Sequence, residues 1–176
     1  MEILIIGGLF VALMVYVSTK IKRSAAQAFE AEKIETDDFV IEKPDGFLHP
    51  LRDPPDYPFE AYSKTYGERS TRNIWRARTR LRISDGSNLK AHVQEIKKGE
   101  EKIESKKKLD DLPEGQVGVI VRSTKTDDEV DYKVLRKVIQ NKPKNKIYEL
   151  KTTIMEPYGE EFTEKACDFM RGFVVK

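Results

Sequence analysis

Trp75-Arg76-Ala77-Arg78-Thr79-Arg80-Leu81-Arg82-Ile83 is the stretch of the chain that decides the fold. The odd-numbered residues in it are apolar or small, and every even-numbered residue is arginine. Successive side chains of a β-strand point to opposite faces, so alternation with a period of two predicts a half-buried strand. We expect Trp75, Leu81 and Ile83 to face a core and the four arginines to face outward.

The residues after this strand allow two interpretations. Asp85-Gly86 is a hairpin turn signal, and the alternation of Leu89, Ala91 and Val93 with polar residues predicts a partner strand. The same stretch also fits a helix over residues 88–98, with Leu89, Val93 and Ile96 on one side and Gly99 as its stop. We favour the hairpin and keep the helix as the alternative.

Further along, two strands and two helices are predicted. Residues 117–121 are a short apolar run that predicts a well-buried strand, and residues 147–155 predict a further strand. Residues 97–108 are dominated by Lys and Glu and predict a solvated face or loop. Residues 127–141 start with the N-cap candidate Asp127 and favour a helix, although their β-branched content leaves a strand as the alternative.

The predicted C-terminal helix, about residues 160–173, is amphipathic. Its apolar residues recur along one stripe, which we expect to cover the domain's own sheet. The stripe consists of Phe162, Ala166, Phe169, Met170 and Phe173.

Residues 36–69 form a segment that is rich in both proline and aromatic residues. Five of the eight prolines of the chain lie within residues 44–58. The aromatic residues among or beside them are Phe47, Tyr57, Phe59, Tyr62 and Tyr66. A disordered linker is normally poor in aromatic residues. We therefore predict an extended strap whose rings lie against the domain, with a partner protein as the alternative surface.

The N-terminus carries an unbroken apolar run over residues 3–17, which Lys20, Lys22 and Arg23 follow. We expect a transmembrane anchor over residues 1–19 with this basic cluster at the membrane interface. A cleaved signal peptide and a buried helix are the weaker alternatives, because a signal peptide has its positive charge before the apolar run. The positive-inside rule then predicts a single-pass protein of the cell membrane with its N-terminus outside and its bulk domain in the cytoplasm.

The predicted architecture is α+β, with a single N-terminal transmembrane helix and a small mixed β-sheet domain that has helices packed on one face. The predicted order is an anchor (1–19), a helical stalk (20–35), the strap (36–69) and a cytoplasmic α+β domain (70–176). Cys167 is the only cysteine, so no intrachain disulfide is possible, which fits a reducing compartment.

The sequence contains no recognisable catalytic set. It has two histidines, no CxxC or HExxH motif and no glycine-rich phosphate loop, so we predict no catalytic residues, metal or cofactor. Cys167 is expected to be a small packed side chain rather than a nucleophile. We therefore lean towards a non-enzymatic protein, with an enzyme whose site is not recognised as an alternative.

The arginine row is the one feature that points to a binding function. Arginines on one strand face can grip phosphates or carboxylates bidentately. We predict an anionic-partner face of Arg72, Arg76, Arg78, Arg80 and Arg82. Carboxylates of the acidic residues 24–66, which carry a net charge of −6, can alternatively neutralise this row within the chain.

The leading hypothesis is a membrane-tethered adaptor or accessory subunit of a membrane complex, with a protein partner that has an acidic surface. Anionic lipid or nucleic acid is the alternative partner of the arginines. Nucleic acid is the less favoured of these, because the net charge of the whole chain is only +2.

Overall fold

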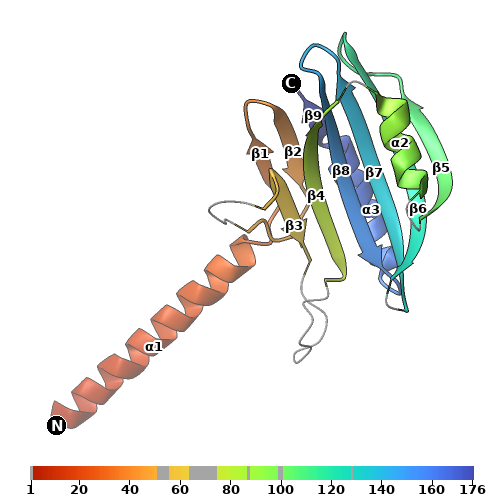
Figure 1. Ribbon diagram of the computed structural model, residues 1–176. Coiled ribbons are helices and arrows are strands. Elements are labelled where there is room, and N and C mark those ends of the chain that lie inside the picture. The colour runs from red at the N-terminus through yellow and green to blue at the C-terminus, as the bar shows by residue number, and fades with distance from the viewer. Residues whose placement is uncertain (1, 51–55, 64–74, 87, 99–100, 128) are drawn as a thin grey trace.

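The computed structural model describes residues 2–50, 56–63, 75–86, 88–98, 101–127 and 129–176. The described chain has a mixed α+β fold with two antiparallel sheets and three helices (Figure 1). The larger sheet has the strand order β3 (Phe59–Tyr62), β4 (Ala77–Asp85), β8 (Lys146–Met155), β7 (Val130–Asn141), β6 (Gln116–Asp127), β5 (Lys102–Leu109). The smaller sheet has the order β1 (Glu32–Glu35), β2 (Phe39–Lys43), β9 (Phe173–Val175).

The predicted strand at residues 75–83 is confirmed as β4, with one shift in its alternation. Leu81 is fully buried and Ile83 packs against the core, as predicted. Residue 76 is a bend outside the strand, so the alternation fails there. Trp75 consequently packs against Tyr62 with tilted rings, on the sheet face opposite to the one predicted. Arg76 turns towards Tyr158 and Glu161 at the start of helix α3 (Gly159–Arg171).

Helix α3 covers one face of the larger sheet and confirms the predicted amphipathic helix (Figure 1). All five residues of its predicted stripe are buried, although Phe173 belongs to β9 rather than to the helix. The strap contributes to the same core, as predicted. Phe47 packs edge-on against Phe169, with 4.9 Å between ring centroids, and Phe59 lies 6.0 Å from Phe169.

Helix α2 (Leu89–Lys98) occupies the segment for which we favoured a hairpin strand. The Asn88 side chain caps the helix by accepting a hydrogen bond from the Ala91 N–H. Val93 packs on Val121 and Val138, on the face of the sheet that lies opposite to α3 (Figure 1). The two helices therefore cover both faces of the sheet, not one as predicted.

Two further elements differ from expectation. Residues 130–141 form strand β7 rather than a helix, in line with the β-branched content that left the strand open, and Glu129 takes a positive φ of 64° in the turn from β6. The Lys-rich residues 102–109 form the mostly exposed edge strand β5, which confirms the predicted solvated face but not the loop. Exposed lysines are typical of edge strands because they discourage pairing with other chains.

The N-terminal residues form helix α1 (Glu2–Gln27), which projects away from the sheets (Figure 1). It ends before the predicted stalk does, and residues 32–35 of that stalk form β1 instead. In the part of the chain that the structure describes, no helix has a stretch long and apolar enough to cross a membrane. The predicted transmembrane helix is therefore not supported. An apolar run of 15 residues rises only about 22 Å, against a bilayer core of about 30 Å.

Candidate functional site

The sheet face on the α2 side carries the candidate site, and strand register brings its residues together. Directly opposed residues of antiparallel strands point to the same face. One such row runs Glu60, Arg80, Lys151, Arg136 and Val121 across five strands. The hydrophobic patch under α2 occupies one part of this face, and the charged residues occupy the part that α2 leaves open.

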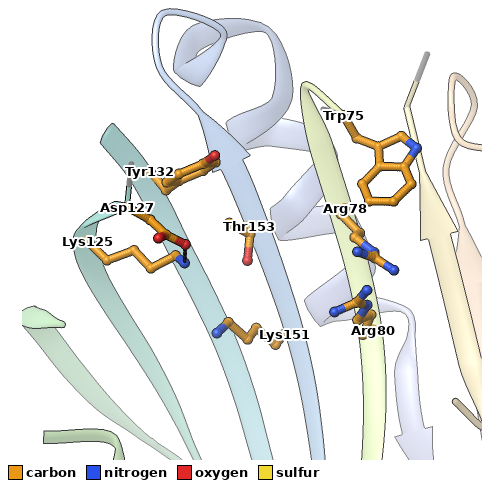
Figure 2. Close-up of a pocket in the computed structure, with 8 residues that line it drawn as sticks. All are labelled: Trp75, Arg78, Arg80, Lys125, Asp127, Tyr132, Lys151 and Thr153. Atoms are coloured by element: carbon orange, nitrogen blue, oxygen red, sulfur yellow. Dashed lines mark hydrogen bonds and ion pairs between the residues drawn. The ribbon is translucent and has the colours of Figure 1, made fainter. Parts of the chain in front are cut away.

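A pocket of about 360 Å³ lies on this open part, and we call it the basic pocket (Figure 2). Its cationic lining is Arg78 and Arg80 of β4, Lys151 of β8 and Lys125 of β6. Trp75, Tyr132, Thr153 and Asp127 complete it. Four cations and a single carboxylate therefore line a pocket that also offers two aromatic rings.

Carboxylates and rings hold three of these cations in place. Arg78 and Arg80 both bind the carboxylate of Glu60, which is buried, and the Nε of Arg80 lies 3.1 Å from it. Arg78 lies over the Trp75 ring at 4.1 Å, and Arg80 over the Tyr57 ring at 4.5 Å. Because Glu60 belongs to the acidic segment, the predicted pairing within the chain occurs for these two arginines, but one carboxylate offsets only one of their two positive charges.

Lys125 is held in the same way on the far side of the pocket. Its Nζ lies 3.0 Å from an Asp127 carboxylate oxygen and 5.0 Å from the centroid of the Tyr132 ring. Fixed side chains lose less conformational entropy when they bind a ligand. Three of the four cations of the basic pocket are thus held in place before any ligand binds.

A buried ionic network lies next to the basic pocket. Arg136 is 4% exposed and donates to both oxygens of Glu101 and to Glu149 Oε1, the latter at 2.8 Å. Glu149 also binds His92 Nε2 at 2.7 Å, and Glu101 binds Lys151 Nζ at 3.4 Å. This network connects His92 of α2 to Lys151, which lines the basic pocket.

The pKa values in the network follow from burial and from these pairs. Burial alone raises the pKa of Glu101, but the hydrogen bonds and charge of Arg136 outweigh it and lower the pKa to about 2. The pKa of Glu149 is lowered in the same way, since the bonds to His92 and Arg136 exceed the effect of burial. Burial and the neighbouring Arg136 lower the pKa of Lys151. The two acids are therefore carboxylates at neutral pH.

The structure separates the residues of the predicted anionic-partner face. Arg78 and Arg80 lie together in the basic pocket, and Arg82 is exposed on the same strand face, opposite Glu149. Arg76 lies instead near α3, and Arg72 falls outside the described residues. Of the predicted membrane-interface cluster, Lys20, Lys22 and Arg23 are all exposed on α1.

Sequence reasoning missed Lys125, Tyr132 and Lys151 as members of this site. The β4–β8, β7–β8 and β6–β7 registers bring them to the same pocket as Arg78 and Arg80, and no local pattern in the sequence encodes those registers. Among the described residues, no group of three or more His, Cys, Asp or Glu side chains is arranged to hold a metal ion.

Comparisons with known proteins identify the fold. No protein-family model matches the chain, and no curated protein matches it. Among solved structures it is similar to LpqN of Mycobacterium tuberculosis, which is described as involved in cell envelope biogenesis, at 11% identity and a TM-score of 0.58 over 84% of this chain and 91% of that one.

Two further solved structures share the fold. The cyanobacterial PsbP (CyanoP) of Synechocystis has 12% identity and a TM-score of 0.55 over 84% of this chain and 94% of that one. The Ran-binding protein Mog1p of Saccharomyces cerevisiae has 11% identity and a TM-score of 0.53 over 84% of this chain and 96% of that one. At these identities the similarity establishes the fold alone.

Proposed function

We propose that this protein is a non-enzymatic interaction domain whose basic pocket binds an acidic segment of a partner protein. The observation that carries the proposal is the clustering of Arg78, Arg80, Lys125 and Lys151 around one open pocket. The planar guanidinium group of arginine can bind a carboxylate through two hydrogen bonds. The rings of Trp75 and Tyr132 offer apolar contact beside the arginines. The description of Mog1p as Ran-binding lends support, because it shows that a protein with this fold can bind another protein.

The test removes two pocket cations without leaving a buried carboxylate unpaired. Arg80→Gln leaves Arg78 on Glu60, and Lys125→Gln frees only Asp127, whose side chain is exposed. The matched control is Lys107→Gln with Lys108→Gln, which removes the same charge from exposed positions on edge strand β5. Proteins are captured by crosslinking after gentle solubilisation of membranes, and the stoichiometry of each captured protein is measured.

The proposal expects one stoichiometric partner that the pocket variant loses by tenfold or more and that the control retains. Retention by both variants contradicts it. Salt-sensitive binding of phosphatidylglycerol vesicles or a single-stranded oligonucleotide, lost only in the pocket variant, would favour the alternative of direct lipid or nucleic-acid binding through the arginines.

We also propose that α1 attaches the domain to the cell membrane, with the bulk domain in the cytoplasm. Support comes from the large apolar side chains that α1 exposes. They are Phe10, Val11, Leu13, Met14, Val15, Tyr16, Val17 and Ile21, each at least 45% exposed. An apolar surface of this extent on a helix that projects from its domain is typical of membrane contact. Lys20, Lys22 and Arg23 follow it, and basic residues beside an apolar helix are attracted to the anionic cytoplasmic leaflet.

Fractionation tests this attachment. The protein should sediment with membranes, resist carbonate extraction and stay protected from external protease in sealed cells. Release by carbonate contradicts firm attachment, and cleavage of the bulk domain by external protease reverses the orientation.

A further inference from the structure

A second pocket, of about 550 Å³, lies where the end of α1 meets α3. Its position is separate from the basic pocket, because it adjoins α3, which covers the opposite face of the larger sheet. Three cations line it: Lys22 on α1, Arg76 before β4 and Lys165 on α3. Glu161 is the one carboxylate in the lining, and its side chain is 54% exposed.

The polar contacts of these cations leave capacity for an anion. Arg76 lies 3.9 Å from Glu161 and 4.6 Å from the centroid of the Tyr158 ring, and its buried Nε has no hydrogen-bond partner. A buried donor without a partner is costly, and an oxygen of a bound ligand can satisfy it. Lys165 donates to the carbonyl and the carboxylate of Asp45, at 3.0 and 3.1 Å.

The remaining lining is mostly apolar, apart from Gly46 and the polar Ser63. Ala25, Ala26 and Phe29 on one side and Phe162 on the other form this wall. It continues the apolar surface of α1, since Ile21 precedes Lys22 and is 62% exposed. A ligand with a phosphate next to a hydrocarbon chain satisfies both halves of the lining, whereas a free phosphate satisfies only the cations.

We infer that this pocket binds one anionic phospholipid. Its phosphate lies among Lys22, Arg76 and Lys165, and the glycerol and upper acyl chain lie against Phe29 and Phe162. This inference rests on the proposed attachment of α1 to a membrane, which would bring the pocket to the lipid surface. It is independent of the basic pocket.

Helix α1 offers a matched pair of variants for the test. Lys22→Gln and Lys20→Gln each remove one charge from exposed positions of α1, but only Lys22 lines the pocket. If the lipid is held only by diffuse attraction to a basic helix, its affinity falls equally in both variants. If it occupies a defined site, its affinity falls only when Lys22 is replaced. Arg76→Gln and Lys165→Gln probe the wall that α1 faces.

The experiment is native mass spectrometry of the full chain in dodecyl maltoside micelles, titrated separately with dioleoyl-phosphatidylglycerol, dioleoyl-phosphatidylcholine and inorganic phosphate. We expect one phosphatidylglycerol per chain, a fivefold or larger loss of affinity in Lys22→Gln and in Arg76→Gln, and less than a twofold change in Lys20→Gln. Phosphatidylcholine should bind at least tenfold more weakly.

Equal losses in Lys22→Gln and Lys20→Gln overturn the inference, as does binding of inorganic phosphate with the same residue dependence but without lipid. The micelle assay does not require that the protein reside in a membrane in the cell. Release of the protein by carbonate therefore contradicts the proposed attachment without deciding whether the lipid site exists.

Discussion

At the scale of single residues, the neighbouring buried cations Arg136 and Lys137 are stabilised in different ways. Arg136 faces the α2 side and binds the carboxylates of Glu101 and Glu149. Lys137 faces α3 and donates to the carbonyls of Met170 and Phe173, both at 2.7 Å. It thus satisfies carbonyl groups where helix α3 ends, which no residue within the helix can reach. Burial lowers the pKa of Lys137, because no opposite charge offsets it.

Replacing Arg136 tests how much the buried ionic network contributes to the stability of the fold. We expect Arg136→Met to lower the free energy of unfolding by about 3–5 kcal/mol, because it leaves Glu101 and Glu149 buried without their main cation. Urea unfolding measures this change. Arg122→Met removes the same charge from an exposed position on β6 and should change stability by less than about 0.5 kcal/mol. Equal effects of the two variants would show that the network contributes no more than an ordinary surface charge.

The lowered pKa of Glu101 predicts how stability depends on pH. The pKa falls from an ordinary 4.5 to about 2 in the folded state, so the unfolded state binds more protons between these values. The stabilisation by Glu101 is therefore fully present above about pH 4.5 and is lost as the pH falls through about 2. It amounts to roughly 3 kcal/mol at most.

Urea unfolding at a series of pH values checks this prediction. The loss of stability on acidification should be shallower in Glu101→Gln than in the unsubstituted protein, because the substituted side chain does not titrate. Superimposable pH profiles would show that Glu101 has an ordinary pKa in the folded state.

At the scale of elements, periodicity was informative only where one period fitted the residues. The alternation at residues 75–83 and the apolar stripe at residues 162–173 each fit one period, and both predict the right element, although β4 begins only at Ala77 and Phe173 belongs to β9. Residues 88–98 and 127–141 fit two periods, and the preferred interpretation was wrong in both cases. Tertiary packing decided both segments. As helix α2, the first places Val93 on Val121 and Val138, and as strand β7, the second pairs with β6 and β8.

The buried side chain of Phe169 holds helix α3 against the sheet. Phe169 is fully buried between Phe47 and Phe59. We expect Phe169→Ala to cost about 3–5 kcal/mol in the free energy of unfolding, since it removes the apolar side chain and leaves a cavity. Phe10→Ala on α1, where the ring is 62% exposed, is the matched control and should leave unfolding of the domain unchanged. A small effect of Phe169→Ala would show that α3 is loosely attached.

At the scale of the whole molecule, the C-terminal residues join the two sheets. Helix α3 covers the larger sheet, and β9 then pairs with β2 of the smaller one. The strap includes β2 and β3, and its Phe47 packs against Phe162 and Phe169 of α3. Segments more than 100 residues apart along the chain therefore share one core.

Ending the chain after Pro157 tests this joint role. The truncated protein lacks α3 and β9 and exposes the apolar face formed by residues such as Phe47, Leu81 and Ile139. We expect it to aggregate or to bind a hydrophobic dye, because large exposed apolar patches promote association. A truncated chain that stays monomeric with an unchanged melting temperature would show that α3 serves an external partner instead.

The sequence by itself determined the strand at residues 75–83, the amphipathic C-terminal helix, the attachment of the aromatic strap to its own domain and the mixed α+β class. These features depend on local periodicity and on the need to bury large apolar side chains, which are readable along the chain. Only the tertiary structure decided the choice between helix and strand at residues 88–98 and 127–141, the placement of Arg76 and the assembly of the basic pocket. Strand register and the bend at residue 76 set these features, and both depend on contacts between residues distant in sequence.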